Sequence, residues 1–153
     1  MDDSLAENYG TIEIRVCDMP STLAVTLGLV ALIHNLVINT QRLLQERPQL
    51  CRGDIRRHWI AIENKWLATR YGLQAMHIRT PSGKRRILSH DLSDLIERLR
   101  PIAQETGDWP FLSAIRPGGQ FETSADRQRR LFRDSGNWKS LIEDMTRRWG
   151  EEL

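Results

Sequence analysis

The chain has 153 residues, a formal net charge of +2 at pH 7, and contents of 40% hydrophobic and 27% charged residues. This length suits one domain with a sizeable core, and the composition argues against a disordered chain or an integral membrane protein. Arginine supplies 19 of the 22 basic residues. That bias suits anionic substrates, nucleic acid or dense ion pairing, and GC-rich coding would also produce it.

Targeting signals are not evident in the sequence. The longest apolar run, Leu23 to Ile33, contains Thr26 and is shorter than the roughly 20 residues of a membrane span, so we expect no transmembrane helix. The N-terminal residues MDDSLAEN are acidic and polar, unlike a secretory signal. Cys17 and Cys51 have no metal-ligand spacing and are expected to be reduced thiols. These features predict a cytoplasmic protein.

Residues 1–9 are predicted to be a flexible N-terminus, and residues 10–153 a single domain. The stretch TIEIRVC, residues 11–17, alternates aliphatic and polar side chains and predicts a β-strand with one buried face. Glu13 and Arg15 then share the other face. A lone strand exposes unpaired backbone groups, so we expect its sheet partners to come largely from outside this chain.

Two helices are predicted next. Pro20 and Ser21 end the strand and offer an N-cap for a helix over residues 22–46, which we expect to be buried because it is apolar nearly all round. Asp54 begins a second helix that ends at Tyr71 before Gly72. The expected core face of this second helix carries Ile55, Trp59, Ile62 and Trp66.

The remaining elements are a hairpin and more helices. Residues 75–88 predict a hairpin around the turn Pro81 to Lys84, and a helix beginning at Asp91 is expected to kink at Pro101. Its apolar stripe consists of Leu92, Leu95, Ile96 and Leu99. Shorter helices are predicted over residues 109–115, 124–133 and 138–149. The fold class is therefore α+β and mostly helical.

Four phrases together resemble a known family: GTIEIRVCDMPST before a long apolar helix, ENKWLATRYGL, the basic hairpin, and GGQFETSADRQRR. From Gly10 almost to the C-terminus the chain resembles the C-terminal part of the carboxylate–amine ligases, specifically glutamate–cysteine ligase type 2. This resemblance implies a glutamine synthetase-like antiparallel sheet, to which the first strand and the hairpin contribute, packed by a helical bundle. It also implies ATP and Mg²⁺ or Mn²⁺ as cofactors.

The resemblance implies that Glu13 binds the metal and that Arg15 contacts a phosphate or the substrate carboxylate. The chemistry suits this pair, because residues i and i+2 of a strand lie about 6 to 7 Å apart on one face. Hard divalent cations prefer carboxylate oxygens, and a migrating phosphoryl group needs nearby positive charge. The alternative is a cross-strand salt bridge on a solvated sheet face.

Further site residues follow from the other phrases. Asn64 and Arg70 in ENKWLATRYGL are implied to face the nucleotide or substrate, Arg70 with a catalytic role and Asn64 with a cofactor-binding role. Lys65 and Leu67 stand where the family has arginines. Arg127, followed by Gln128, matches an RQ pair of the family and is implied to bind cofactor. The alternatives are a C-terminal helix cap for Arg70 and a polar helix start for Arg127.

Members of the family are commonly more than twice this length. The resemblance therefore implies an N-terminal half, or a second copy, that completes the sheet, with glutamate and an amine such as cysteine as substrates. Two other functions stay open: a noncatalytic remnant or partner subunit with the ligase fold, and an arginine-rich nucleic-acid binder. The last is disfavoured, because the net charge is only +2 and no recognition motif accompanies the basic clusters.

Overall fold

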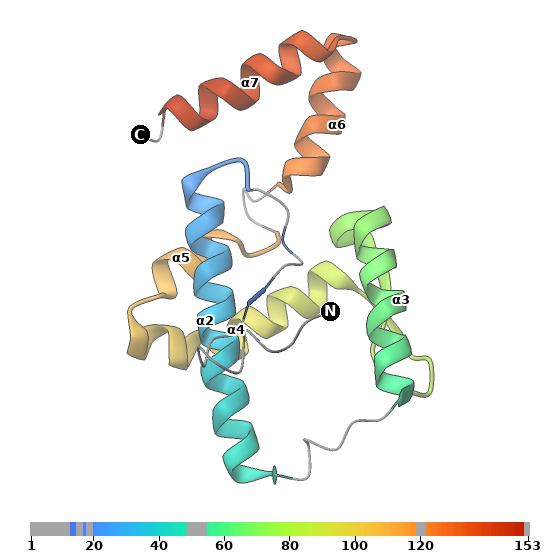
Figure 1. The fold of residues 1–153 in the computed structure, drawn as a ribbon, viewed down its shortest axis with the longest axis vertical. Coiled ribbons are helices and arrows are strands. Elements are labelled where there is room, and N and C mark those ends of the chain that lie inside the picture. The colour runs from blue at the N-terminus through green and yellow to red at the C-terminus, as the bar shows by residue number, and fades with distance from the viewer. Residues whose placement is uncertain (1–12, 15–16, 18–19, 49–54, 119–121, 152–153) are drawn as a thin grey trace.

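The structure is a computed structural model that describes residues 13–14, 17, 20–48, 55–118 and 122–151. Helices dominate it, and one small antiparallel sheet completes the described part (Figure 1). The predicted class, α+β and mostly helical, is confirmed. The expected flexible segment 1–9 lies outside the described residues.

The long helix α2 spans Leu23–Glu46, close to its predicted bounds. Its N-cap is Thr22, one residue after the expected Ser21, and the Thr22 hydroxyl accepts a hydrogen bond from the Val25 N–H at 3.2 Å. Gly28 lets α2 approach α5 closely: a Cβ there would overlap the Ile115 side chain and lie 3.2 Å from the Phe111 carbonyl oxygen. The core contact of α2 therefore depends on its small residues.

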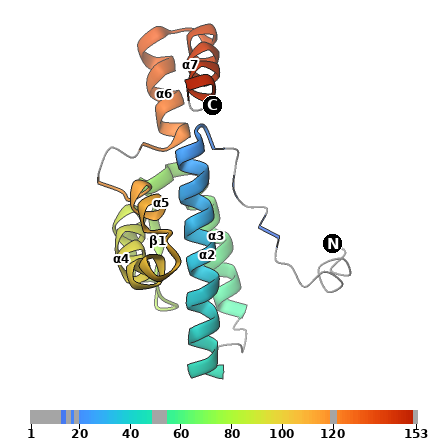
Figure 2. The ribbon, with the colours of Figure 1, turned by 90° about the vertical axis from the view of Figure 1, so that its left-hand side faces the viewer.

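Helices α4 (Leu88–Thr106) and α5 (Trp109–Ala114) pack against one side of α2, as Figure 2 shows. The main core lies between these three helices. Its buried members are Ala31, Ile96, Leu99, Ile102, Ala103, Leu112 and Ile115. The predicted stripe of α4 is thereby confirmed at Ile96 and Leu99, while Leu92 and Leu95 are partly buried against the cluster.

Helix α4 starts earlier than predicted, while the kink expected at Pro101 stays a prediction. It begins at Leu88, three residues before Asp91, directly after a strand and without a side-chain cap. It also continues through Pro101 to Thr106, so the proline does not end it. The helix ends at Gly107, whose φ of 80° is left-handed and suits glycine.

Helix α3 (Ile55–Tyr71) leads into a short 3₁₀ helix, η2 (Gly72–Gln74), and then into the hairpin. Strands β1 (Met76–Ile78) and β2 (Arg85–Ile87) pair antiparallel, with His77 opposite Arg86. The predicted hairpin is therefore confirmed, although each strand has only three residues. It is the sole sheet within the described residues.

Two expectations about burial were wrong. The apolar face of α3 does not enter the core: Trp59 and Trp66 are 64% and 53% exposed, and Ile62 is exposed as well. Helix α2 is buried on one side only, and Val30 on its other side is 58% exposed. Apolar periodicity predicts which side chains share a face but does not say what covers that face.

The argument from length against a membrane span also needs correction. At 24 residues, α2 is long and apolar enough to cross a membrane by length and composition, and 17% of its most apolar stretch is buried. It is the one such helix among the residues described. The expectation counted only the apolar run from Leu23 to Ile33, whereas apolar residues continue along the helix after His34 and Asn35.

Helices α6 (Ser124–Ser135) and α7 (Trp138–Glu151) form a helical pair at one end of the molecule (Figure 1). Both were predicted. Gly136, with φ of 68°, ends α6, and the Phe132 and Trp138 rings stack across the turn with centroids 4.3 Å apart. A hydrogen bond of 3.0 Å from Ser124 to Ser21 joins the start of α6 to the segment before α2.

The predicted first strand lies mostly outside the described residues. Glu13, Ile14 and Cys17 are described; all three are exposed and none belongs to the sheet. Arg15 lies outside the described residues. Whether Glu13 and Arg15 share one face of a strand therefore stays a prediction.

Candidate functional site

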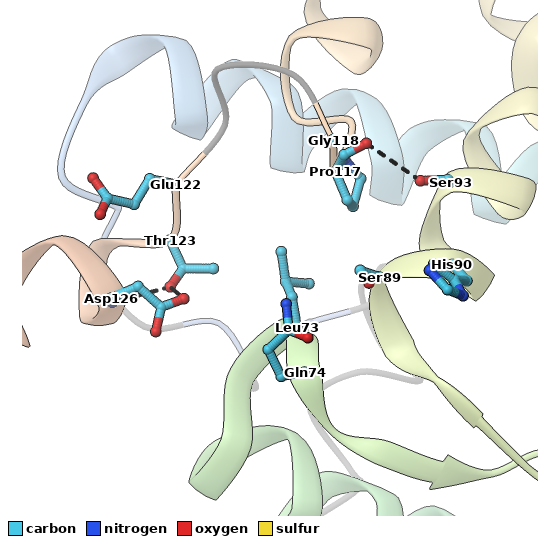
Figure 3. Close-up of a pocket in the computed structure, with 10 residues that line it drawn as sticks. All are labelled: Leu73, Gln74, Ser89, His90, Ser93, Pro117, Gly118, Glu122, Thr123 and Asp126. Atoms are coloured by element: carbon cyan, nitrogen blue, oxygen red, sulfur yellow. Dashed lines mark hydrogen bonds between the residues drawn. The ribbon is translucent and has the colours of Figure 1, made fainter.

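A polar cavity of about 380 Å³ opens where α4, η2 and the segment before α6 meet (Figure 3). Its lining comes from four places in the sequence: the 3₁₀ helix after α3, the first turns of α4, the turn at Pro117 and the start of α6. The lining residues are Leu73, Gln74, Ser89, His90, Ser93, Pro117, Gly118, Glu122, Thr123 and Asp126.

Local backbone geometry brings these segments together. Gly72 has φ of +57°, a left-handed conformation that turns the chain from α3 into η2. A Cβ at Gly72 would lie 3.7 Å from Asp126 Oδ2, so this turn sits against the first turn of α6. Thr123 caps that helix, accepting from the Asp126 N–H at 3.1 Å and donating to the Asp126 carboxylate at 2.7 Å.

Charge at the cavity is arranged in ion pairs. Arg130 donates two hydrogen bonds to Glu122, at 3.0 and 2.9 Å, and these lower the pKa of the Glu122 carboxyl. Asp126 pairs with Arg129 at 3.0 Å. The cavity wall therefore carries anionic oxygens whose charge arginines outside the cavity balance.

Several polar groups of the cavity are available to a ligand. Ser93 donates a hydrogen bond of 3.4 Å to the Pro117 carbonyl oxygen. Within the described part of the chain, the side chains of Gln74, Ser89 and His90 make no hydrogen bond. A hydroxyl, a carboxamide and an imidazole offer both donors and acceptors to a small polar molecule.

The Asn64 amide lies against the hairpin, and its predicted contact with cofactor stays a prediction. Its Nδ2 donates to the Ile78 carbonyl oxygen at 2.7 Å, and its Oδ1 accepts from the Ile78 N–H at 2.7 Å. Both hydrogen-bonding ends of the amide are thus used to fasten α3 to β1.

Arg70 lies exposed at the end of α3. Its guanidinium is 5.9 Å from the centroid of the Trp66 ring and 5.6 Å from that of Tyr71, and its Nε donates to the Tyr71 hydroxyl at 3.3 Å. The cation is thus held over two aromatic faces, with its remaining N–H groups toward solvent. This arrangement leaves Arg70 able to contact an anionic group.

Arg127 holds the α6–α7 pair together. It donates to both carboxylate oxygens of Asp144, at 2.9 and 2.7 Å, and both side chains are largely buried. Asp144 also pairs with Arg147 at 3.0 Å. Arg127 follows Asp126 of the cavity but is committed to this pair, while its neighbour Gln128 contacts the Met145 sulfur at 3.7 Å.

The predicted site residues are therefore not gathered into one cluster. Asn64 and Arg70 lie on α3 and Arg127 on α6, and each makes its contacts with a different neighbour. Glu13 is exposed before α2. Arg15 lies outside the described residues, so its position relative to Glu13 is untested.

The arginine bias has a structural counterpart in ion pairs. Arg86 bonds Asp91 at 2.7 Å and Asp94 at 2.5 Å, and these contacts lower the pKa of Asp94. Together with the pairs of Arg127, Arg129 and Arg130 above, they show that the basic clusters are largely matched by carboxylates. Of the four explanations for the arginine bias, dense ion pairing is the one that these contacts support.

Sequence reasoning missed a second polar cluster beside the hairpin. His77 on β1 and Asp91 on α4 approach to 2.8 Å, with both side chains largely buried, and they line a cavity of about 390 Å³ with Arg79 and Arg98. No spacing in the sequence links His77 with Asp91, because only the hairpin brings β1 to the start of α4. The cavity of Figure 3 was easier to anticipate from the sequence, since most of its lining residues lie in or beside the phrases that carry the family resemblance.

A metal site is not formed by the described residues. Within them, no group of three or more histidine, cysteine or carboxylate side chains has the geometry to hold an ion. Glu13 is a single carboxylate there, so these residues do not make up the ligand set that Mg²⁺ requires.

The fold and the site together define an α+β protein that has a polar cavity between its helices, with the charged groups of the cavity held in ion pairs. The family model for glutamate–cysteine ligase family 2 (GCS2) matches residues 1–147. The chain belongs to this family, as the resemblance implied.

Curated relatives agree with this membership. A protein of Corynebacterium glutamicum (strain R) named "Putative glutamate–cysteine ligase 2" is 35% identical over 145 residues, which are 90% of this chain and 36% of that protein. A Mycobacterium ulcerans (strain Agy99) protein of the same name is 35% identical over 89% of this chain and 34% of its own length. A Rhodococcus jostii (strain RHA1) protein named "Putative glutamate–cysteine ligase 2-2" is 37% identical over 86% of this chain and 34% of its own length. The chain thus spans about a third of these relatives.

Proposed function

We propose that this chain forms part of an ATP-dependent carboxylate–amine ligase of the glutamate–cysteine ligase type. The observation that carries the proposal is the cavity of Figure 3. The end of the phrase ENKWLATRYGL supplies Leu73, and GGQFETSADRQRR supplies Gly118, Glu122 and Asp126. Two phrases that carry the family resemblance, 45 positions apart in the sequence, thus meet around one polar space, which is the arrangement expected of a shared ligand site.

The proposed reaction has two steps. A substrate carboxylate oxygen attacks the γ-phosphorus of ATP, which releases ADP and leaves an acyl phosphate. The nitrogen of the amine substrate then attacks the acyl carbon, and inorganic phosphate leaves as the amide forms. Positive charge around the phosphoryl group stabilises both steps, since negative charge shifts between oxygens.

Arginines of this chain are proposed to supply part of that charge. Arg70 is exposed and oriented by two aromatic rings, and Arg15 keeps the role of contacting phosphate or carboxylate. Asn64 and Arg127, whose polar groups are engaged within the chain, are proposed to act by positioning the walls of the site. In this proposal Asn64 and Arg127 contribute to cofactor binding indirectly, through the position of the walls.

The metal is proposed to come with further ligands. Glu13 is assigned as one ligand of Mg²⁺, and the described residues supply no complete ligand set. When bound, a divalent cation would draw charge from the ATP phosphates. The other ligands, and much of the substrate pocket, are proposed to lie on polypeptide that carries the remainder of the family's length.

The test is reconstitution. The chain is mixed with the segment of the C. glutamicum relative that it does not match, and Mg²⁺-dependent ADP release is followed with glutamate and cysteine. Activity is expected only in the mixture, and Glu13→Ala is expected to lower it at least 100-fold. Glu46→Ala, an exposed glutamate at the end of α2, is the matched control and should leave the rate unchanged.

Two results would contradict the proposal. A Glu13→Ala mixture as active as wild type would remove the metal-ligand assignment. ADP release that proceeds equally without either amino acid would point to another reaction. A stable but inactive mixture would favour the alternative of a noncatalytic family member.

A further inference from the structure

We propose that the outer face of α2 and the aromatic face of α3 form the docking surface for the polypeptide that carries the other two thirds of the family's length. The outer face of α2 is defined here by Leu27, Val30, Ile33 and Val37, and the aromatic face of α3 by Trp59, Ile62 and Trp66. The inference deepens the proposed function and rests on its claim that this chain works with such a polypeptide.

The outer face of α2 is apolar, and no helix among the described residues covers it. From Leu23 to Gln41 the helix contains no Asp, Glu, Lys or Arg, so it is apolar on two sides. One side packs against α4 and α5, which lie together on one side of α2 in Figure 2. On the other side Val30 is 58% exposed and Leu27 is exposed. Apolar surface of this extent marks an interaction site.

An apolar hollow lies on this face. Ile14, ahead of α2, lines an apolar hollow of about 310 Å³ together with Ile33, Val37 and Leu44. Ile14 therefore lies beside the outer face of α2. Polypeptide that carries an adjoining part of the family fold would extend this contact along the helix.

The aromatic face of α3 adds a second apolar area. Trp59, Ile62 and Trp66 recur at the spacing of one helix face, and all three are exposed. The Trp66 ring meets the Tyr71 ring edge-on, with centroids 6.2 Å apart. Tryptophans on a rigid helix are typical anchors of protein interfaces because they bury a large area at low entropic cost.

A lipid bilayer fits this surface less well than protein does. Helix α2 contacts a charged group: the buried Asn35 donates to the Asp108 carboxylate at 2.8 Å, and His34 lies 2.7 Å from the same carboxylate. Inserting α2 would bring this carboxylate toward the membrane interior, at considerable cost. It would also strip α4 and α5 of their core partner.

The length of the relatives indicates the occupant. The chain covers 34–36% of the curated relatives named above, and the part matched by the family model includes both α2 and α3. In those proteins the same helices share one polypeptide with about twice as much further sequence. That sequence is the partner to which we assign the surface, in preference to a second copy of this chain.

The experiment measures binding of the full 153-residue chain to the unmatched segment of the C. glutamicum relative. Co-expression of the two shows whether a complex forms, and titration of one purified partner with the other, followed by tryptophan fluorescence, gives the affinity. We expect a 1:1 complex with blue-shifted emission. Val30→Glu and Trp66→Glu should each weaken binding at least about 30-fold, as for a central interface residue. Ile142→Glu, 61% exposed on α7, introduces the same charge at similar exposure and should leave the affinity unchanged.

Each result decides the proposal, and circular dichroism of the variants shows that they are folded. Affinity that resists both substitutions, or the absence of any complex, overturns it. A concentration-dependent dimer of the chain that Val30→Glu dissociates would assign the face to a second copy, and binding to vesicles of anionic and zwitterionic phospholipid would assign it to a membrane. A complex that forms as expected yet releases no ADP would remove the proposed function and leave the docking surface standing.

Discussion

The Asn64 side chain on α3 hydrogen-bonds both backbone groups of Ile78 on β1, donating to the carbonyl oxygen and accepting from the N–H, each at 2.7 Å. The amide thus acts like one more backbone unit of a strand. It ties a helix to an edge of a hairpin whose strands have only three residues each. Along the chain, η2 lies between the two elements that this contact joins, and it supplies one wall of the polar cavity.

Asn64→Ala is expected to destabilise the chain by about 2 kcal/mol, because it leaves two partly buried backbone groups without their partner. Chemical denaturation of the full chain measures the loss. Thr69→Ala on the same helix removes an exposed hydrogen bond to the Lys65 carbonyl oxygen and should cost less than about 0.5 kcal/mol. Unchanged stability together with lost nucleotide binding would show that Asn64 contacts cofactor directly.

Gly72 is expected to tolerate substitution poorly, because its φ of +57° lies in the left-handed region. Gly72→Ala should lower stability by about 1–2 kcal/mol, and Gly72→Asn by less, since asparagine adopts this conformation more readily. In the reconstituted ligase, both should weaken substrate or nucleotide binding in the same order if the cavity serves as proposed. Equal stability of the glycine, alanine and asparagine forms would mean that the turn is not strained.

The Arg127–Asp144 pair predicts a pH dependence of stability. Hydrogen bonds from Arg127 lower the pKa of the Asp144 carboxyl in the folded chain. The pair therefore contributes fully above the unfolded carboxyl pKa of about 3.9, and its contribution is lost as the pH falls through the lower folded pKa.

Asp144→Asn should cost about 2 kcal/mol at pH 7, because it leaves a largely buried guanidinium without its carboxylate. The free energy of unfolding of this variant should also fall less than that of wild type between pH 5 and pH 2. Asp134→Asn, an exposed change on α6, is the control. An Asp144→Asn curve that parallels wild type at all pH values would contradict the assignment.

Local sequence signals were enough to locate most elements. The long apolar run, Gly72 and the turn around Pro81 predicted α2, α3 and the hairpin, because caps, breakers and periodicity act over a few neighbouring residues. The start of α4 was missed by three residues, since no capping side chain marks it. Two phrases of the family resemblance also pointed to segments that line the polar cavity.

By itself, the sequence determined the helical character of the chain, its hairpin and its membership of the glutamate–cysteine ligase family. Only the tertiary structure decided that Asn64 and Arg127 bind within the chain, that His77 meets Asp91, and that the tryptophans of α3 face outward. The physical reason is the separation in sequence of the residues that interact. Helix and turn signals depend on adjacent residues, whereas these contacts join residues from 14 to 17 positions apart or depend on what covers a face, and burial is a property of the whole assembly.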